Sequence, residues 1–211
     1  MSNVCKDDEQ LSFIDCIRKQ LAITQGGEIA RRYFAMNAFD GLLPILGILV
    51  GGFVSLYHQT PLVIFQTSSL AILATSMAMF ISGLTSSYLT EGAEQKRDME
   101  ELEQAMIADL GKSMIWQASR TTTIVVSIIN GLSPFLTGLL TASPLVLVIF
   151  GLGIQTAFLT AILMGLVILF FLGGYLGHVS RTNMVIYGIK TASAGVAIVL
   201  LTFFFSVIVG V

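Results

Sequence analysis

A single carboxylate, Asp40, lies inside a long apolar stretch and is the residue best suited to chemistry there. No other charged residue occurs between Phe34 and Tyr57. An ionisable side chain within a membrane span is costly and usually marks a transport or coupling function. Asn37 and Pro44 lie within about one turn of Asp40, and a proline frees helix carbonyls that can coordinate a cation beside a carboxylate. The sequence therefore predicts that Asp40 and Asn37 serve permeation or proton coupling; the alternative is a structural pair with a neighbouring helix.

Two methionines at mid-depth of the next apolar stretch, Met77 and Met79, are candidate soft ligands. Thioethers favour transition metals over Mg²⁺ or Ca²⁺. The alternative is plain packing, which is the usual role of methionine in an apolar helix. The sequence therefore places Met77 and Met79 on a candidate translocation path with Asp40.

A third group of candidates lies in the acidic stretch 90–120, which is predicted to be a helix that continues out of the second apolar stretch. Four carboxylates at i, i+3, i+7 and i+10 share one face of that helix: Glu91, Glu94, Asp98 and Glu101. Clustered carboxylates are hard oxygen ligands for Mn²⁺, Fe²⁺, Mg²⁺ or Ca²⁺. The alternative is a solvated acidic face that Lys96 and Arg97 partly compensate.

Composition indicates a polytopic, all-α membrane protein, because 55% of the 211 residues are hydrophobic and only 11% are charged. The mean hydropathy is +0.84. Stretches of about 20 apolar residues are long enough to cross the hydrocarbon as helices. Five such spans are predicted, near 34–57, 61–89, 121–142, 145–177 and 184–210, and turn residues at 141–144 separate the third from the fourth. The predicted organisation is a helix in 1–30 followed by a membrane domain, 31–211.

No enzyme is expected, because the stretches outside the predicted spans are too short for a catalytic domain. The chain contains no P-loop, GxSxG, HExxH or CxxC motif. The sequence predicts neither a resident cofactor nor a nucleic-acid partner. The expected partners are the lipid bilayer and the transported ion.

Orientation follows from the Lys and Arg residues, which number 11. With five crossings, all of them lie on one face, and the positive-inside rule makes that face cytoplasmic. The amino terminus is therefore predicted to be cytoplasmic and the carboxyl terminus extracytoplasmic.

The first 30 residues predict an amphipathic helix on the inner membrane surface rather than a secretory signal, because acids precede the apolar residues. Both cysteines, Cys5 and Cys16, would be cytoplasmic, which argues against a disulfide. Two small-residue pairs, Gly47 with Gly51 and Gly173 with Gly177, would permit close helix contact either between subunits or within one subunit.

Several short segments resemble the vacuolar iron transporters, which export ferrous iron or manganese from the cytoplasm. Asp40-Gly41-Leu42 is similar to that family's Asp-Gly-Leu segment, whose aspartate lies in the metal path. Ser76-Met77-Ala78 is similar to its Ser-Met-Ala, whose methionine faces the same path. The acidic stretch, the segment from Gly131 to Pro134 and the number of spans also fit. The resemblance extends over most of the chain, which looks like a divergent, compact member.

This resemblance implies a homodimeric proton antiporter that exports Fe²⁺ or Mn²⁺, with Asp40 and Met77 of each subunit lining the path. The sequence departs from the family where Phe80-Ile81 replaces a Gly-Glu pair, and its cytoplasmic segment is shorter. Two rival functions therefore remain open. One is a non-transporting scaffold or accessory subunit, and the other is a proton-coupled carrier of a different solute.

Overall fold

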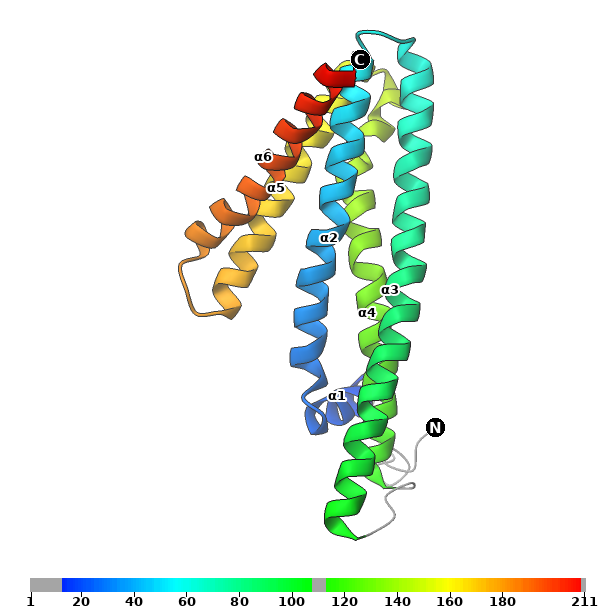
Figure 1. Ribbon diagram of the computed structural model, residues 1–211, viewed down its shortest axis with the longest axis vertical. Helices are drawn as coiled ribbons and strands as arrows, with labels where there is room; N and C mark the ends of the chain where they lie inside the picture. Colours follow the sequence, from blue (N-terminus) through cyan, green and yellow to red (C-terminus); the bar gives the residue numbers. More distant parts are fainter. Residues whose placement is uncertain (1–12, 108–112, 210–211) are drawn as a thin grey trace. The chain divides into compact units, whose positions relative to one another are not determined.

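The computed structural model describes residues 13–107 and 113–209, which form six α-helices and one 3₁₀-helix without any strand. Helix α1 is short, whereas α2 to α6 are long (Figure 1). The bounds are α1 Phe13–Ile23, α2 Gly26–Ser55, α3 Pro61–Met106, α4 Met114–Val146, η2 Leu147–Phe150, α5 Ile154–Val179 and α6 Met184–Val209.

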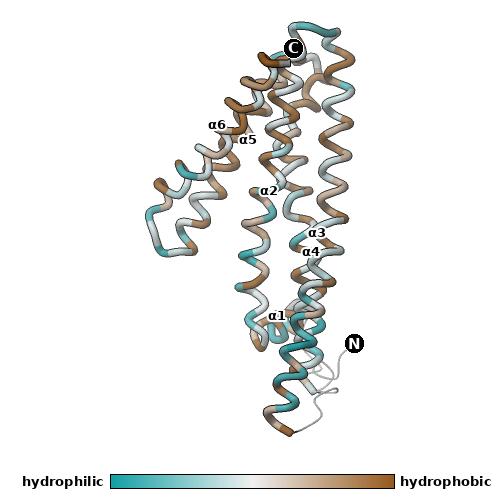
Figure 2. Tube along the Cα trace, in the orientation of Figure 1, coloured by the Kyte–Doolittle hydropathy of each residue, from teal (hydrophilic) through white to brown (hydrophobic). Residues whose placement is uncertain are grey.

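Five helices in the described part of the chain, α2 to α6, are long and apolar enough to cross a membrane. The chain is therefore an all-α integral membrane protein, as the sequence predicts. Hydrophobic residues dominate α5 and α6, whereas hydrophilic residues gather in the last turns of α3 (Figure 2).

The helices contribute to two compact units. Among the described residues, the first unit comprises 13–34, 81–107 and 113–132, and the second comprises 35–80 and 133–209. The hydrophobic core of the second unit is built from α2, α3, α4 and α5. Its largest fully buried side chains include Phe158, Leu42, Ile45, Leu46 and Leu49. In this unit α5 and α6 run side by side (Figure 1).

The predicted boundary at 141–144 is wrong, because α4 continues through these residues to Val146. Pro144 cannot donate to the carbonyl of Leu140, but the Ser143 hydroxyl donates to that carbonyl at 2.8 Å. Thr141 likewise bonds back to the helix, at the carbonyl of Thr137. The chain turns instead after η2, where Gly151 has a φ of 97°. Hydroxyl groups that satisfy helix carbonyls thus allow Ser, Thr and Pro to remain inside a membrane helix.

The acidic stretch does continue α3 as a helix, but only as far as Met106. Ile107 has a positive φ of 52° and ends it, and α4 begins at Met114. The Ser113 hydroxyl accepts a hydrogen bond from the Trp116 N–H at 3.2 Å and so caps the start of α4. A single helix over 90–120 is therefore not formed, although Asp109 and Leu110 lie outside the described residues.

Within the first unit, α1 lies next to α4. The hydroxyls of Thr24 and Thr122 are hydrogen-bonded, and Gly26 packs against Leu21 and Thr122. The expectation of free thiols is wrong for Cys16, which is disulfide-bonded. The expectation was based on the reducing conditions of the cytoplasm. It did not consider the geometry of the fold, which is the other requirement for a disulfide.

The two glycine pairs serve different surroundings. Gly173 and Gly177 of α5 pack directly on the backbone of α6, at Tyr187 and Met184 respectively. A hydrogen bond from the Thr191 hydroxyl to the Leu169 carbonyl, at 2.8 Å, joins the same two helices. Gly173 and Gly177 therefore serve helix packing within one subunit, which is one of the two roles that the sequence left open. By contrast, a Cβ added to Gly47 or to Gly51 would have Thr202 of α6 as its nearest described neighbour outside α2, at 4.0 Å.

Candidate translocation path and acidic helix

Asp40 is exposed on α2, although it lies in the apolar part of that helix. Within the described residues its carboxylate makes no hydrogen bond and no ion pair. Pro44 lies four residues later inside the same helix and has no N–H to donate to the Asp40 main-chain carbonyl. Asp40 therefore offers two kinds of oxygen donor, a carboxylate and a carbonyl released from the helix ladder.

Glycines in the second unit bring α2 and α3 close to the same segment of α4. A Cβ on Gly41 would lie 2.6 Å from the Cα of Pro134. One turn further along α4, a Cβ on Gly138 would lie 2.5 Å from Ile45 and 2.7 Å from the Ser76 hydroxyl. Asp40 is the neighbour of Gly41 and Met77 is the neighbour of Ser76. Since an α-helix rises about 1.5 Å per residue, the positions of Asp40 and Met77 along the axis of α4 differ by about one or two helical turns.

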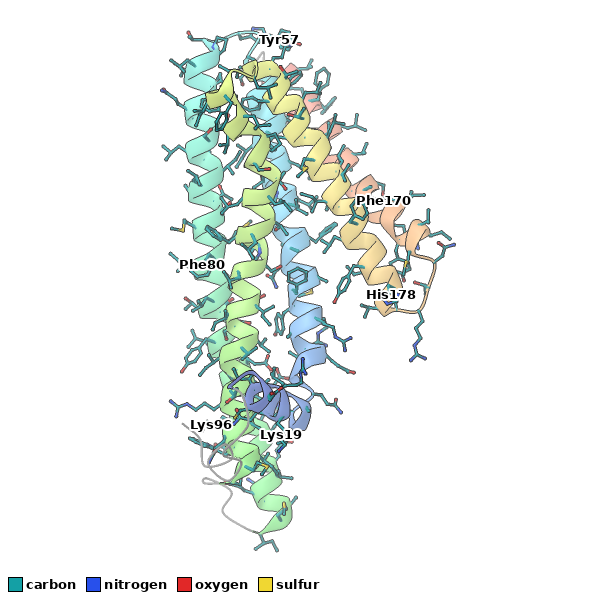
Figure 3. All side chains as sticks on the ribbon, turned by 180° about the vertical axis from the view of Figure 1, so that it is seen from behind. Lys19, Tyr57, Phe80, Lys96, Phe170 and His178 are labelled. Carbon is teal, nitrogen blue, oxygen red and sulfur yellow. The ribbon has the colours of Figure 1, made fainter. Side chains whose placement is uncertain are left out.

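An aromatic contact confirms this register between α3 and α4. The rings of Phe80 (labelled in Figure 3) and Phe135 lie with centroids 5.7 Å apart. Phe80 belongs to the Phe80-Ile81 pair that replaces Gly-Glu. Its aromatic side chain therefore packs on α4 at the depth of Pro134.

The other predicted residues of the path differ in exposure. Met77 is 55% exposed, whereas Met79 and Asn37 are half-buried. Ser76 is fully buried, and its hydroxyl has no hydrogen-bond partner within the described residues. Met77 therefore presents its thioether at the surface of one copy of the chain, as Asp40 presents its carboxylate.

Met36 is a candidate that the sequence reasoning missed. It is 56% exposed and lies four residues before Asp40, so the two side chains share one face of α2. Side chains on a helix lean towards its amino terminus, which directs the Asp40 carboxylate over Met36. The i, i+4 spacing of a methionine and a carboxylate was the signal that could have identified it.

The four predicted acidic ligands do not share one environment. Glu91 is buried, with 4% exposure, whereas Glu94, Asp98 and Glu101 are exposed. Glu101 accepts a hydrogen bond from the Arg97 guanidinium at 2.9 Å. The neighbouring Lys96, labelled in Figure 3, is 79% exposed and lies 3.8 Å from Glu100. Three of the four carboxylates therefore remain accessible on the surface of α3.

Glu91 is buried because α2 approaches α3 at this level in the first unit. Its carboxylate accepts hydrogen bonds from the Tyr33 hydroxyl and the Gln95 amide, both at 3.5 Å. Tyr33 therefore serves as a hydrogen-bond donor to the buried Glu91 carboxylate.

Within the described residues, no three His, Cys, Asp or Glu side chains are grouped so that they could hold a metal ion. A metal path built on Asp40 would therefore use thioether and carbonyl donors, or donors from a second copy. Soft thioethers beside one hard carboxylate would be a mixed donor set of the kind that suits a transition metal.

Comparison with known proteins identifies a similar protein, but the activity of that protein is not known. No family model matches the chain. The chain is 28% identical over 188 residues to an uncharacterized protein of Methanocaldococcus jannaschii, and the alignment covers 88% of this chain and 93% of that protein. The similarity thus extends over nearly all of both chains. The resemblance to vacuolar iron transporters remains a proposal.

Proposed function

We propose that this chain is a transporter, not an enzyme, and that it exports Fe²⁺ or Mn²⁺ from the cytoplasm by proton antiport. The observation that carries this proposal is the exposed Asp40 carboxylate, which has no partner within the described residues of one copy. A carboxylate facing hydrocarbon at the centre of a helix costs about 2.5–3.5 kcal/mol on translocon-insertion scales. A water-filled path or a second subunit would remove that cost.

A homodimer is the arrangement that best accommodates these residues. In a symmetric dimer, each copy supplies the same surface to the other. Asp40 and Met77, both exposed in a single copy, would then line a path between the subunits, with Asn37 and Met79 half-buried beside it. The carboxylates would bind the metal and exchange it for protons, because an acid alternates between the two.

The proposed topology places the amino terminus and the last turns of α3 in the cytoplasm and the carboxyl terminus outside it. In this arrangement α1 is an amphipathic helix on the inner surface of the membrane. The exposed carboxylates of α3, Glu94, Asp98 and Glu101, would collect cytoplasmic metal ahead of the path. Glu91 would stabilise the helix through Tyr33 more than it would bind metal.

The direct experiment is anaerobic metal flux into proteoliposomes that contain the unaltered chain, in the presence of a pH gradient. Metal uptake that requires the gradient would support the proposal. The absence of flux from well-folded protein would contradict it.

Met36→Leu is expected to lower the preference for Fe²⁺ over Mn²⁺ by at least about threefold, because it removes a soft donor beside Asp40. Leucine keeps the apolar volume of methionine, so folding should be unchanged. The measurement is the ratio of initial Fe²⁺ and Mn²⁺ fluxes. Met184→Leu is the matched control, since Met184 is also exposed, at 46%, but belongs to α6. An unchanged ratio in Met36→Leu would exclude the thioether from the path.

Neutralising the three exposed acids together, as Glu94→Gln, Asp98→Asn and Glu101→Gln, is expected to raise the metal concentration at half-maximal flux. The saturated rate should change less, because these side chains lie outside the predicted span. Concentration dependence of flux measures both quantities. Glu91→Gln, tested alone, should instead lower thermal stability, because it weakens the contact with Tyr33. An unaltered metal dependence in the triple variant would favour a merely solvated acidic face.

A non-transporting scaffold is the second candidate, and the buried Glu91 favours it. The structure uses this carboxylate in contacts with Tyr33 and Gln95, which is a structural role. In the scaffold, the Asp40 carboxylate would pair with a helix of another protein. Protection of the α3 acids from carboxyl-modifying reagents by Fe²⁺ or Mn²⁺ would distinguish the transporter from this scaffold and from a carrier of another solute.

A further inference from the structure

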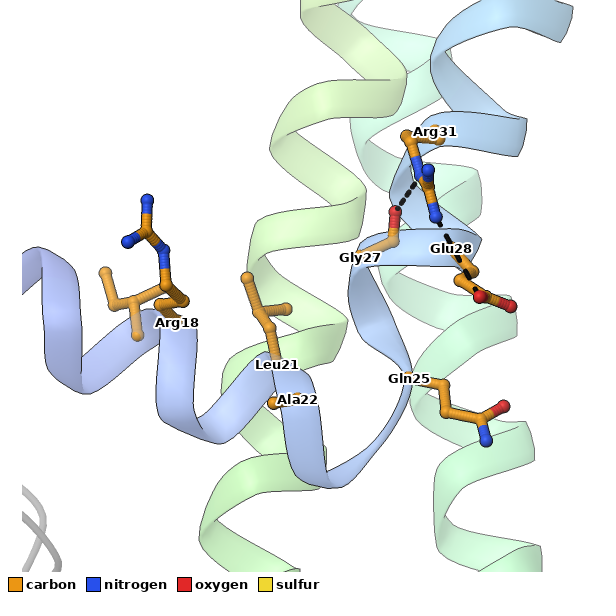
Figure 4. Close-up of a pocket in the computed structure, with 8 residues that line it drawn as sticks. Arg18, Leu21, Ala22, Gln25, Gly27, Glu28 and Arg31 are labelled. Atoms are coloured by element: carbon orange, nitrogen blue, oxygen red, sulfur yellow. Dashed lines mark hydrogen bonds and ion pairs between the residues drawn. The ribbon is translucent and has the colours of Figure 1, made fainter. Parts of the chain in front are cut away.

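We infer that the elbow between α1 and α2 binds the headgroup of an anionic phospholipid. The elbow forms a hollow of about 580 Å³ within the first unit, lined mainly by residues 17–31 (Figure 4). Arg18 enters it from α1 and Arg31 enters it from α2, while Ile17 and Leu21 supply apolar surface between them. This inference requires only that the chain is a membrane protein, and it is independent of the transport proposal.

The two arginines keep most of their hydrogen-bonding capacity. Arg18 is exposed and makes no hydrogen bond or ion pair within the described residues. Arg31 donates through Nε to the Gly27 carbonyl at 3.3 Å, and its Nη2 lies 3.9 Å from Glu28, a long and exposed pair (Figure 4). A guanidinium has five N–H donors, so both side chains can still bind phosphate oxygens.

The charge of the hollow favours an anionic headgroup over a zwitterionic one. Its ionisable lining consists of Arg18, Arg31 and Glu28, which gives a net positive charge. The Gln25 amide is a further polar group in the lining. Among the described residues, no atom outside the backbone of α2 itself and the two adjacent residues lies within 4 Å of the position that a Cβ would take on Gly27, so a ligand can approach the backbone there. Arginine is the residue best suited to bind phosphate through two parallel hydrogen bonds.

The depth of the hollow also fits a headgroup. Arg31 precedes the start of the predicted span at Phe34 by three residues, or about 4.5 Å of helix rise. In the close-up, Arg18 and Leu21 project from α1 towards the side to which α2 runs (Figure 4). Lipid phosphate groups occupy the layer next to the hydrocarbon, and the glycerol and first methylene groups would contact Ile17 and Leu21.

The test is binding of short-chain phosphatidylglycerol to the full-length protein in a zwitterionic detergent, measured by calorimetry. Arg18→Gln with Arg31→Gln is expected to weaken binding by about tenfold or more. The matched control is Lys19→Gln with Arg32→Gln, which removes the same charge at the adjacent residues that do not line the hollow. This control should weaken binding by less than about twofold.

Three results would overturn the inference: equal losses in the two double variants, no loss in either, or equally tight binding of short-chain phosphatidylcholine. If the same concentration of inorganic phosphate displaced phosphatidylglycerol completely, the ligand of the hollow would be a free anion and not a lipid. All four arginine and lysine positions are exposed, and unchanged circular dichroism in both variants would establish that folding is intact.

Discussion

Asp40→Asn is expected to reduce metal flux to the level of protein-free liposomes while leaving the protein folded. The amide keeps the size of the side chain but removes the negative charge that the proposal assigns to cation binding and the acid that it assigns to proton exchange. Because Asp40 makes no hydrogen bond or ion pair within the described residues, its loss should not destabilise one copy of the chain. Anaerobic Fe²⁺ flux and the thermal unfolding temperature measure the two effects separately.

The control for this variant is Asp15→Asn, which removes an exposed carboxylate from α1, outside the predicted spans. It should retain the flux of the unaltered protein. Unchanged flux in Asp40→Asn would remove Asp40 from the mechanism. Lost flux accompanied by lost folding would indicate that Asp40 pairs with another helix, which is the structural alternative.

Gly173→Ala is expected to lower the apparent unfolding temperature by about 5 °C, which corresponds to about 2 kcal/mol for a chain of this size. A Cβ at this position would overlap the Thr191 hydroxyl and lie 2.6 Å from the Tyr187 carbonyl of α6. Backbone atoms cannot move aside without separating α5 from α6, and that separation would also break the bond between Thr191 and the Leu169 carbonyl.

Gly47→Ala is the matched control, because the nearest neighbour of an added Cβ there, among the described residues outside α2, would be Thr202 at 4.0 Å. This substitution should leave stability unchanged or raise it slightly, since alanine favours the helix over the unfolded chain. Thermal unfolding of both variants in the same detergent provides the comparison. Equal stability of the two variants would mean that α5 and α6 are not packed at Gly173 as described.

The sequence predicts the helices well where hydropathy alone determines them. The five apolar stretches correspond to α2 to α6, because a membrane span must satisfy all its backbone groups internally. It fails at 141–144, where Ser143 and Pro144 resemble a turn. The hydroxyl of Ser143 satisfies the carbonyl that Pro144 frees, and this contact depends on a rotamer that the sequence does not reveal.

For the candidate site, the sequence identifies residue types but not their surroundings. Asp40 and Met77 were recognisable by type and depth, yet their exposure depends on which helix faces pack on α4. Glu91 and Asp98 share a helix face, but Glu91 is buried beside Tyr33 whereas Asp98 is exposed. A helical wheel shows the shared face and cannot predict this difference in burial. The sequence does not single out Met36, because methionine is common in apolar helices.

The central claim is that the chain couples metal export to proton entry. The most direct measurement is initial Fe²⁺ uptake into sealed, oriented proteoliposomes under an imposed pH gradient, with the lumen acidic, neutral or alkaline relative to the bath. An acidic lumen should accelerate uptake, because protons leaving the lumen would drive metal inwards, and the lumen should become more alkaline as Fe²⁺ enters. Uptake that ignores the gradient, or no uptake by well-folded protein, would contradict the account.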